Sequence, residues 1–340
     1  MHYRAGMELR GRAPAGWDSR ISFPILSEGF GEAERGVGYR PHFVEEARDR
    51  ALVLLRSVPL PVARAWTLRA KAYVDRGDPE FVRALLARLH QIGAAHVKLN
   101  DERHGLPDTT VWTWPRVRAV PRWVFLIDVA GRTDGELLKA MQDPVPRNIR
   151  KAERAGVVVS EMKSEDDLRA FMALMDDTSD RMRARHVAAV YPAAFFEAAF
   201  RAMVPRGQAL FLLARANGEP VAGQMYLVSR NKLTYYHGAS TRARELTPKQ
   251  GPTATFWHAI CLARDREIAV FDFGGANPTS DPADVHFPIT EFKRRWGGRH
   301  VMIPCADVIL SPVKVAFQDR CLKPFWGRAH TTYLRVFRTA

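Results

Sequence analysis

A lysine that follows a phenylalanine, close to two pairs of glycines, is the most chemically informative pattern in this sequence. Glycines at the end of a strand let the backbone approach a ligand closely, so Gly274 and Gly275 are candidate substrate contacts. A lysine in such a place can balance negative charge that develops on a carbonyl oxygen, which makes Lys293 a candidate catalytic residue. The alternative for an isolated lysine is an ordinary surface position. The two segments are Phe271-Asp272-Phe273-Gly274-Gly275 and Phe292-Lys293-Arg294-Arg295-Trp296-Gly297-Gly298.

Three polar rings follow one another at Tyr235, Tyr236 and His237, inside a pattern typical of a strand. On a regular strand, Tyr235 and His237 share one face while Tyr236 points to the other. Tyrosine and histidine together offer hydrogen-bond donors, an acceptor and a group that can shuttle a proton. We therefore expect at least one of the three to bind substrate. The alternative is a ring in the core whose polar tip finds a partner there.

Basic residues recur at helical spacing after Pro146. Arg147, Arg150, Lys151 and Arg154 are three or four positions apart, so on a helix they form one ridge. The arginine fork suits phosphate oxygens, which predicts an RNA or phosphate contact at this ridge. A solvated helix face is the alternative, because an acidic residue stands among the four.

A second basic cluster runs from Arg181 to His186. Arg181, Arg183 and Arg185 occupy alternate positions, so they cannot share one helix face but would line one side of an extended segment. A loop of this kind near a cleft would bind an anion, which makes Arg183 and Arg185 candidate substrate-binding residues. A solvated surface is again the alternative.

The composition favours a negatively charged partner. The formal net charge is +14, and a field of this size attracts polyanions such as RNA or an acidic membrane surface. Arginine supplies 41 of the 51 basic residues, an excess that genomic base composition alone can also produce. The three cysteines are too few and too widely spaced for a disulfide framework or a zinc pattern, so we expect no metal.

The sequence contains no membrane or export signal of its own. No apolar run approaches the ~18–20 residues that span a bilayer, and the Arg- and Gly-rich start has no apolar segment of signal-peptide type. We therefore expect a cytoplasmic protein. The positive charge and the aromatic Phe325 and Trp326 near the C-terminus leave peripheral association at the inner membrane face open.

The elements that must position these residues predict an α+β fold. Three consecutive strands are predicted at 208–216, 220–228 and 232–240, with Asn217-Gly218 as a hairpin turn. A helix at 252–266 and a buried strand at 268–273 then lead to the glycine pair. Pro144 and Pro146 interrupt an earlier helical pattern, and we expect a domain boundary there. The predicted divisions are an N-terminal arm at 1–20, a first lobe at 21–145, a second lobe at 146–320 and a C-terminal tail at 321–340.

Taken together, these segments resemble the FemABX family of aminoacyl-tRNA-dependent peptidyltransferases, which form peptidoglycan bridges and belong to the GNAT superfamily. The resemblance implies two GNAT-like (acyl-CoA N-acyltransferase) lobes, each a mixed, mostly antiparallel sheet flanked by helices. It also implies aminoacyl-tRNA as co-substrate, no bound cofactor, and an amine acceptor on a peptidoglycan precursor. In the family the lysine of the Phe-Lys pair contributes to the transfer step, which points to Lys293 with Phe292 beside it. The resembling stretches are Ser27–Pro41, Arg147–Val157, Val221–Ser240 and Phe271–Gly298.

Two positions depart from the family pattern. Glu34 stands where the family often has a lysine near the precursor's phosphates, and Asn100-Asp101-Glu102 stands where it often has Asp-Pro-Tyr. A carboxylate repels a diphosphate, so a different amine acceptor is also open.

Two other functions are open as well. One is an acetyl-coenzyme A-dependent acetyltransferase, which would bind a pyrophosphate at the predicted helix start at 249–253, although Pro252 lacks an N–H donor. The other is a non-catalytic RNA- or precursor-binding protein.

Overall fold

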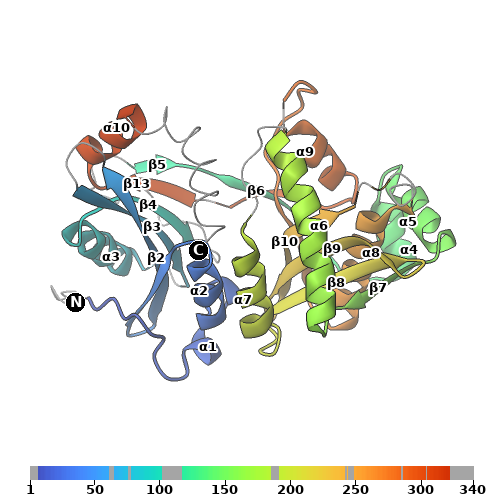
Figure 1. Ribbon diagram of the computed structural model, residues 1–340, viewed down its shortest axis with the longest axis horizontal. Coiled ribbons are helices and arrows are strands. Elements are labelled where there is room, and N and C mark those ends of the chain that lie inside the picture. Colours follow the sequence, from blue (N-terminus) through green and yellow to red (C-terminus); the bar gives the residue numbers. More distant parts are fainter. Residues whose placement is uncertain are drawn as a thin grey trace. The chain divides into compact units, whose positions relative to one another are not determined.

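The computed structural model describes residues 7–60, 65–75, 78–101, 117–184, 191–241, 243, 249–284, 286–303 and 305–321. The chain divides into two compact units (Figure 1). Unit 1 comprises Met1–Pro14, Tyr39–Val120 and Pro304–Ala340, and unit 2 comprises Ala15–Gly38 and Pro121–Ile303. Each unit contains one mixed, mostly antiparallel sheet with helices, so the expected α+β class is confirmed.

Unit 1 is built on a six-stranded sheet in the order β1-β2-β3-β4-β13-β5. Every neighbouring pair is antiparallel except β3 and β4, which run parallel. Parallel neighbours require a crossover connection, which helix α3 provides. The strands are β1 (Arg40–Glu46), β2 (Asp49–Leu60), β3 (Ala65–Val74), β4 (Ala94–Asp101), β5 (Val117–Ala119) and β13 (Cys305–Ile309).

Helix α3 (Pro79–Gln91) forms the core of unit 1 with one face of this sheet. Asp78 caps the helix by accepting hydrogen bonds from the N–H groups of Glu80 at 2.8 Å and Phe81 at 3.3 Å. Pro79 occupies the first turn, where no intrahelical donor is needed. The helix Pro312–Cys321 (α10) follows β13. The buried α3 side chains that pack on the sheet are Phe81, Val82, Leu85, Leu86 and Leu89.

Unit 2 is built on a seven-stranded sheet in the order β12-β6-β11-β10-β9-β8-β7. Here β10 and β11 are the parallel pair, and helix α8 connects them. The expected hairpin turn between β8 and β9 is confirmed, with positive φ angles of 54° at Asn217 and 82° at Gly218. The strands are β6 (Arg122–Asp128), β7 (Val157–Glu161), β8 (Ala209–Ala216), β9 (Glu219–Val228), β10 (Lys232–Ser240), β11 (Val270–Gly275) and β12 (Arg299–Ile303).

Helices cover both faces of the unit 2 sheet. On one face, Phe171 of α6 packs against Phe211 of β8, with ring centroids 5.5 Å apart, and α6 crosses in front of the strands in Figure 1. On the other face, Phe256 of α8 packs with Phe271 and Phe273 of β11. The helices of this unit are α1 (Trp17–Arg20), α2 (Glu28–Arg35), α4 (Asp134–Ala140), α5 (Val145–Arg154), α6 (Glu165–Ala184), α7 (Ala193–Met203), α8 (Gly251–Asp265) and α9 (Phe287–Arg294).

The two sheets share one order of elements. Three antiparallel strands, a helix and a parallel strand follow one another as β1-β2-β3-α3-β4 in unit 1 and as β8-β9-β10-α8-β11 in unit 2. Each parallel strand then has an antiparallel neighbour from elsewhere in the sequence, β13 beside β4 and β6 beside β11. The expected pair of similar lobes therefore appears as a repeated topology, without a repeated sequence.

The expected lobe boundaries do not coincide with the two units. Strand β6 lies before the expected boundary at 145/146 but pairs with β11 and β12 of unit 2. Residues 15–38 also belong to unit 2, since Phe30 of α2 packs against Phe195 of α7. Strand β13 returns to unit 1. Pro146 does not break the chain into lobes, because it lies in the first turn of α5, where proline is tolerated.

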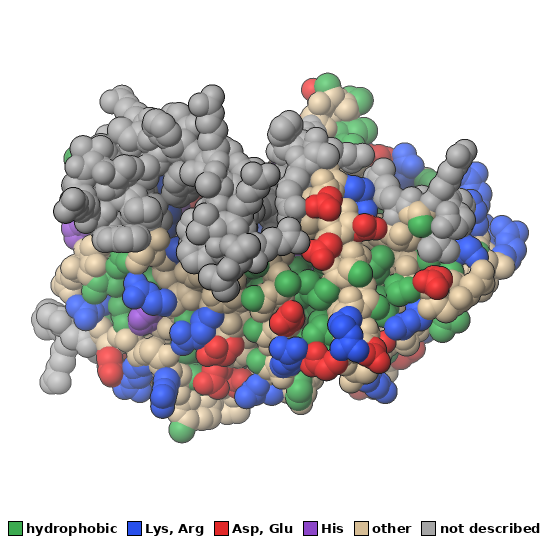
Figure 2. All heavy atoms as spheres, viewed as in Figure 1, with side chains coloured by type: hydrophobic (Ala, Val, Ile, Leu, Met, Phe, Trp, Pro, Cys, Tyr) green, Lys and Arg blue, Asp and Glu red, His purple; other side chains and the backbone are tan. Residues whose placement is uncertain are grey.

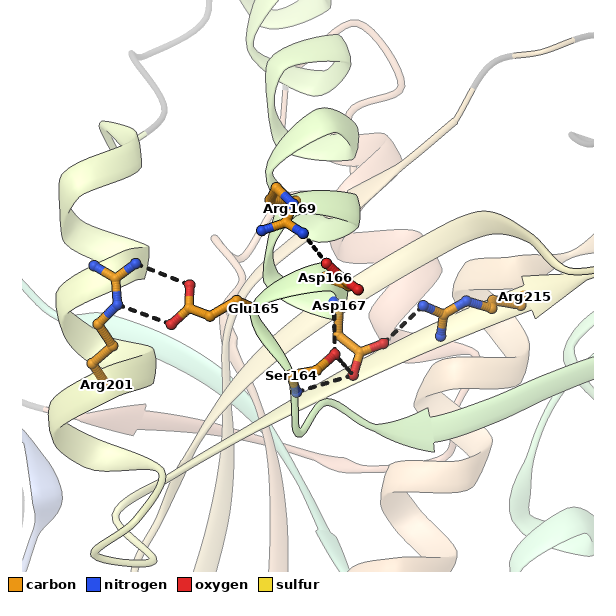
Figure 3. Close-up of polar contacts among 7 residues, drawn as sticks. All are labelled: Ser164, Glu165, Asp166, Asp167, Arg169, Arg201 and Arg215. Atoms are coloured by element: carbon orange, nitrogen blue, oxygen red, sulfur yellow. Dashed lines mark hydrogen bonds and ion pairs between the residues drawn. The ribbon is translucent and has the colours of Figure 1, made fainter.

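The start of α6 is fixed by polar contacts to two other elements (Figure 3). Asp167 accepts hydrogen bonds from Ser164 N at 3.2 Å and from Arg215 of β8 at 2.8 Å. Burial by itself raises the pKa of Asp167, but these hydrogen bonds outweigh that effect and lower the pKa to about 2. Glu165 receives two hydrogen bonds of 3.0 Å from Arg201 of α7. These pairs connect the start of α6 to its neighbouring helix α7 and to strand β8 of the sheet beneath.

The link between α9 and β12 requires glycine, which gives a test of this part of the fold. Gly297 has a φ of +80°, and a Cβ there would overlap the carbonyl oxygen of Ala140. We expect Gly297→Ala to lower the free energy of unfolding by about 2 kcal/mol or more. Gly135→Ala, in helix α4 with no close neighbour, is the matched control and should be neutral or slightly stabilising. Urea denaturation of both variants measures the difference, and equal effects would contradict this packing.

Candidate functional site

The parallel strands β10 and β11 pair only over their first residues. Their register ends at Thr234 opposite Asp272. Beyond that point, Gly274 adopts a φ of +69°, and a Cβ there would lie 2.9 Å from the carbonyl oxygen of Tyr235. Both the conformation and the close approach exclude a larger residue at Gly274. Gly274 therefore has a role in backbone geometry, just beyond the last paired residues of the two strands. Its expected contact with substrate stays a prediction.

Asp272 fixes the turn at the end of β11. Its Oδ1 accepts a hydrogen bond of 2.7 Å from Gly274 N, and its Oδ2 lies 3.4 Å from the ammonium of Lys232 at the start of β10. The carboxylate is 1% exposed. A buried charge of this kind needs a partner of opposite sign, which Lys232 provides.

Lys293 lies beside this turn, on helix α9. Thr290, one turn earlier, donates a hydrogen bond of 2.8 Å to the carbonyl oxygen of Asn277 and so anchors the helix to the loop after β11. The Lys293 ammonium donates a hydrogen bond of 2.6 Å to the carbonyl oxygen of Gly275. It also lies 5.8 Å from the centre of the Tyr235 ring. The residue is 7% exposed, so its charge is largely removed from water.

Burial lowers the pKa of Lys293 to about 8, and the nearby Asp272 opposes part of this change. At pH 7 the charged form therefore exceeds the neutral form about tenfold. An ammonium has three N–H donors, and the carbonyl of Gly275 accepts one of them. Lys293 can thus donate to a ligand oxygen on which negative charge develops, in surroundings where such a contact is stronger than in water.

The three consecutive rings of β10 do not alternate as expected. Tyr235 packs on Phe256 of α8, with ring centroids 4.8 Å apart, whereas both Tyr236 and His237 contact Phe195 of α7. The expectation that Tyr235 and His237 share a face is wrong. A β-bulge between Tyr235 and His237 shifts the register with β9 and turns His237 to the side of Tyr236.

These rings differ in what they can do chemically. Burial raises the pKa of Tyr235 to about 12, so the phenol keeps its proton. Burial lowers the pKa of His237 to about 4, which leaves the imidazole neutral at pH 7 and a weak base. His237 also contacts the Tyr191 ring at 4.6 Å. Tyr236 and His237 thus pack in an aromatic cluster with Phe195 and Tyr191, while Tyr235 lines the side on which Lys293 lies.

Phe292 and Gly275 are accessible beside Lys293. Phe292 is 37% exposed. Its ring packs on Phe256 and Trp296, with ring centroids 5.7 and 6.1 Å apart. Gly275 is exposed, and a Cβ there would meet no atom within 4 Å. The buried ammonium therefore has an exposed aromatic ring and an open stretch of backbone as neighbours.

The first basic cluster forms the expected ridge. Helix α5 buries Val145, Ile149 and Ala152 and leaves its four basic side chains exposed. In Figure 2 basic side chains gather over the end of unit 2 where Figure 1 places α4 and α5. The arrangement fits a phosphate contact, which stays a prediction. The four exposed residues are Arg147, Arg150, Lys151 and Arg154.

The described part of the second basic cluster, up to Ala184, is helical and not extended as predicted. Helix α6 continues to Ala184 and includes Arg181 and Arg183, because its helical pattern is not interrupted before that point. Arg181 donates hydrogen bonds of 2.9 Å to Thr178 Oγ1 and to the carbonyl oxygen of Ser240, which is a structural role. The Arg183 side chain and the whole of Arg185 lie outside the described part of the chain, so their proposed substrate contacts stay predictions.

The start of helix α8 differs from a simple anion site. Gln250 has a φ of 61°, and Pro252 lies in the first turn without an N–H donor. A Cβ at Gly251 would lie 2.8 Å from Val221 of β9, so the helix start is packed against the sheet.

The two departures from the family pattern lie in buried positions. Glu34 is 0% exposed on α2, and its neighbour Arg35 pairs with Glu32 at 3.0 Å. Asn100 is 6% exposed and lies opposite Cys305 in the sheet of unit 1. Glu34 therefore takes part in the interior of unit 2, and a repulsive carboxylate at the surface is not present at this position.

Sequence reasoning missed Lys232 and Thr290. Lys232 pairs with buried Asp272, and Thr290 ties the helix of Lys293 to the loop after β11. The signal for Lys232 was available, because a carboxylate inside an apolar strand such as Phe271-Asp272-Phe273 requires a cation on a neighbouring strand. Among the described residues, no group of three or more His, Cys, Asp or Glu side chains is arranged to hold a metal ion. None of the described helices has the length and apolarity needed to cross a membrane.

Comparison with known proteins agrees with this architecture. Residues 144–294 match the family described as "Acetyltransferase (GNAT) domain", a segment that begins just before α5 and ends with α9. The chain therefore carries a GNAT-type acetyltransferase domain, which indicates a transferase. No curated protein matches the chain significantly.

Several solved structures share the fold at low sequence identity. FemX is 17% identical over 84% of this chain and 92% of that chain, with a TM-score of 0.62. The C-terminal domain of a putative lysylphosphatidylglycerol synthetase from Agrobacterium fabrum is 14% identical over 91% of this chain and 96% of that one, with a TM-score of 0.56. L-PGS from Bacillus licheniformis is 14% identical over 82% and 88%, with a TM-score of 0.55. At these identities the likeness establishes a Fem-like fold.

Burial of the Lys293 charge predicts a gain of stability when it is removed. At pH 7 the ammonium carries its full desolvation cost in the folded state, so Lys293→Met should raise the free energy of unfolding by roughly 1–3 kcal/mol. The folded pKa of about 8 lies below the unfolded value near 10.5, so the unfolded wild type binds more protons between these values. The free energy of unfolding of the wild type therefore rises with pH over this window. The difference in this free energy between Lys293→Met and wild type becomes smaller as a result.

Urea denaturation at pH 7 and pH 10 measures both effects. Lys139→Met, at an exposed position on α4, is the control. It should show neither the gain in stability at pH 7 nor the change of this gain with pH. A Lys293→Met protein that is less stable than wild type at pH 7 would contradict the account.

Proposed function

We propose that this protein transfers an amino acid from aminoacyl-tRNA to an amine acceptor. The single observation that carries the proposal is the Lys293 ammonium, desolvated just beyond the last paired residues of β10 and β11 and hydrogen-bonded to the Gly275 carbonyl. Such a group suits a reaction in which charge develops on a carbonyl oxygen. The GNAT-type domain and the similarity in fold to FemX support acyl transfer as the reaction class.

The chemistry requires no enzyme nucleophile, because an aminoacyl ester is already activated. The acceptor amine attacks the ester carbonyl carbon, a C–N bond forms, and the carbonyl oxygen becomes an oxyanion. Lys293 donates a hydrogen bond to this oxygen, which is worth about 3–4 kcal/mol for one well-placed donor. The C–O bond to the ribose then breaks, and the ribose oxygen leaves with the proton that the amine gives up. The protein's remaining task is alignment of the two substrates, worth ~7–11 kcal/mol.

The acceptor that we propose is the peptide of a peptidoglycan precursor, as in cell-wall bridge synthesis. The Fem-like fold supports this choice. The fold likeness to a domain named for a putative lysylphosphatidylglycerol synthetase makes a lipid-linked acceptor at the inner membrane face the alternative. Phe292 and Tyr235, which lies on the side of Lys293, are the proposed acceptor and amino-acid contacts. The substrate contacts expected of Tyr236 and His237, on the other face of the sheet, stay predictions. The α5 ridge is the proposed contact for tRNA phosphate.

A second candidate is an acetyl-coenzyme A-dependent acetyltransferase, which the matched domain description favours. The start of α8 argues against it, because Pro252 lacks the N–H that a pyrophosphate would use.

The direct test is transfer from charged total tRNA to separate candidate acceptors, read as a mass shift of the acceptor. We expect Lys293→Met to lower the rate of transfer about 10²–10³-fold, the effect of losing one oxyanion donor. Lys139→Met should transfer at the wild-type rate. Unchanged transfer by a folded Lys293→Met protein would remove the assignment of Lys293.

The pH dependence separates two roles of Lys293. If the ammonium stabilises the oxyanion, the transfer rate falls as the pH rises through about 8, because the neutral amine lacks the charge. If Lys293 removed the proton from the acceptor, the rate would instead rise through the same value. We expect the transfer rate to fall as the pH rises through about 8, and this fall should be absent in Lys293→Met. A rising limb near pH 8 that disappears in the variant would contradict the oxyanion role.

Sensitivity to ribonuclease distinguishes the donors. We expect ribonuclease treatment of the donor mixture to abolish transfer, and acetyl-coenzyme A to support none. Acetylation of an amine from acetyl-coenzyme A in the presence of ribonuclease would favour the acetyltransferase instead.

A further inference from the structure

The sheet of unit 1 carries basic side chains in two neighbouring rows on the face opposite α3. Alternate residues of its strands point toward α3 and are apolar, among them Val53, Ala72, Val97 and Val308. The residues between them point to the other face. By strand register one row contains Lys71, Lys98, Asp307 and Arg118, and the next contains Arg56, Arg69 and His96.

Side-chain contacts at one end show that the groups of these rows lie close together. The Lys71 ammonium lies 4.3 Å and the Arg56 guanidinium 5.7 Å from the centre of the Tyr39 ring. Two cations thus converge on one aromatic ring. Such contacts hold the charges at fixed positions on the face.

At the other end of the rows, an acid is surrounded by cations. His96 Nε2 lies 3.4 Å from Asp307 Oδ1. That contact, together with the charges of Lys98 and Arg118, lowers the pKa of Asp307. Burial raises the pKa but does not cancel this effect. Asp307 is the single acid among the described residues of these two rows, which hold five Lys or Arg side chains. Lys98 and Arg118 are exposed.

We infer that this cationic face of unit 1 binds the phosphodiester backbone of RNA. The rows cross β2, β3, β4, β13 and β5, which at about 4.8 Å per strand extends over roughly 19 Å. This is wider than one diphosphate but suits a run of successive phosphates. A positively charged surface that follows the backbone is how single-stranded nucleic acid is bound without sequence preference. The inference rests on the proposed function for the identity of the RNA, which is then the donor tRNA.

Binding of uncharged RNA tests the surface without any transfer step. The full-length protein is titrated into fluorescent single-stranded RNA and into deacylated tRNA, and anisotropy is measured over a range of salt concentrations. The double variant Lys98→Gln/Arg118→Gln should bind both RNAs more weakly. The slope of log affinity against log salt should fall by about 0.7 per lost contact on the single strand. Asp307→Asn should bind more tightly, because it removes the acid from the rows.

A matched control removes one exposed lysine and one exposed arginine from unit 2. Lys163→Gln/Arg230→Gln changes the net charge equally and should retain wild-type affinity and salt slope. An equal loss in the control would show that only total charge matters and would overturn the inference. Unchanged RNA affinity in Lys98→Gln/Arg118→Gln would overturn it as well.

Two further readouts separate this inference from its rivals. UDP is the probe for a diphosphate site. If Lys98→Gln/Arg118→Gln loses UDP binding but keeps RNA binding, the face binds a nucleotide, and the inference is overturned. Wild-type protein that binds no RNA would remove the tRNA donor of the proposed function together with this surface. Wild-type protein that transfers, and whose RNA affinity does not respond to Lys98 and Arg118, would remove the surface alone.

Discussion

The hydrogen bond from the Lys293 ammonium to the Gly275 carbonyl is the interaction on which the site depends. An ammonium removed from water is costly unless it is paired and hydrogen-bonded. Here the carbonyl provides the bond at 2.6 Å, and Asp272 provides the nearby charge. The same carboxylate holds Gly274 N at 2.7 Å and thereby fixes the turn that presents Gly275. One buried acid thus determines both the backbone geometry and the electrostatic surroundings of Lys293.

The two units share one strand order but differ in where their basic side chains lie. Both contain a parallel pair connected by a helix, β3 with β4 and β10 with β11. Among the described residues, however, Lys293 is the one lysine with less than a tenth of its surface exposed. In unit 1 the basic side chains instead lie on the sheet face opposite α3, where Lys98 and Arg118 are exposed. Charge near the surface suits binding of a polyanion, whereas a desolvated charge suits chemistry on a carbonyl.

Much of the fold could be predicted from local sequence signals. The Asn217-Gly218 turn and the ridge on α5 each depend on neighbouring residues, and each is present as predicted. The domain boundary could not be predicted, since β6 and β13 join sheets formed largely by distant residues. Such pairings depend on contacts that no local pattern encodes.

The candidate site was predictable in part, for the same reason. The Phe-Lys pair and the glycine pair are local patterns, and the structure brings Lys293 and Gly275 into contact. The exchange of faces at His237 was not predictable, because a β-bulge is set by pairing with β9 rather than by alternation within β10. For the Lys232–Asp272 pair, the buried acid signalled that a cation was needed, but the partner lies forty positions away and local sequence does not identify it.

The most direct test of the account is the pKa of the Lys293 side chain in the intact protein. Titration of the labelled lysine side chains by NMR, with the Lys293 signal assigned through its absence in Lys293→Met, measures this value without any substrate. The account predicts a pKa near 8, because the ammonium is desolvated. A value near 10.5, the ordinary value for lysine, would show that the group is solvated and would contradict the central claim.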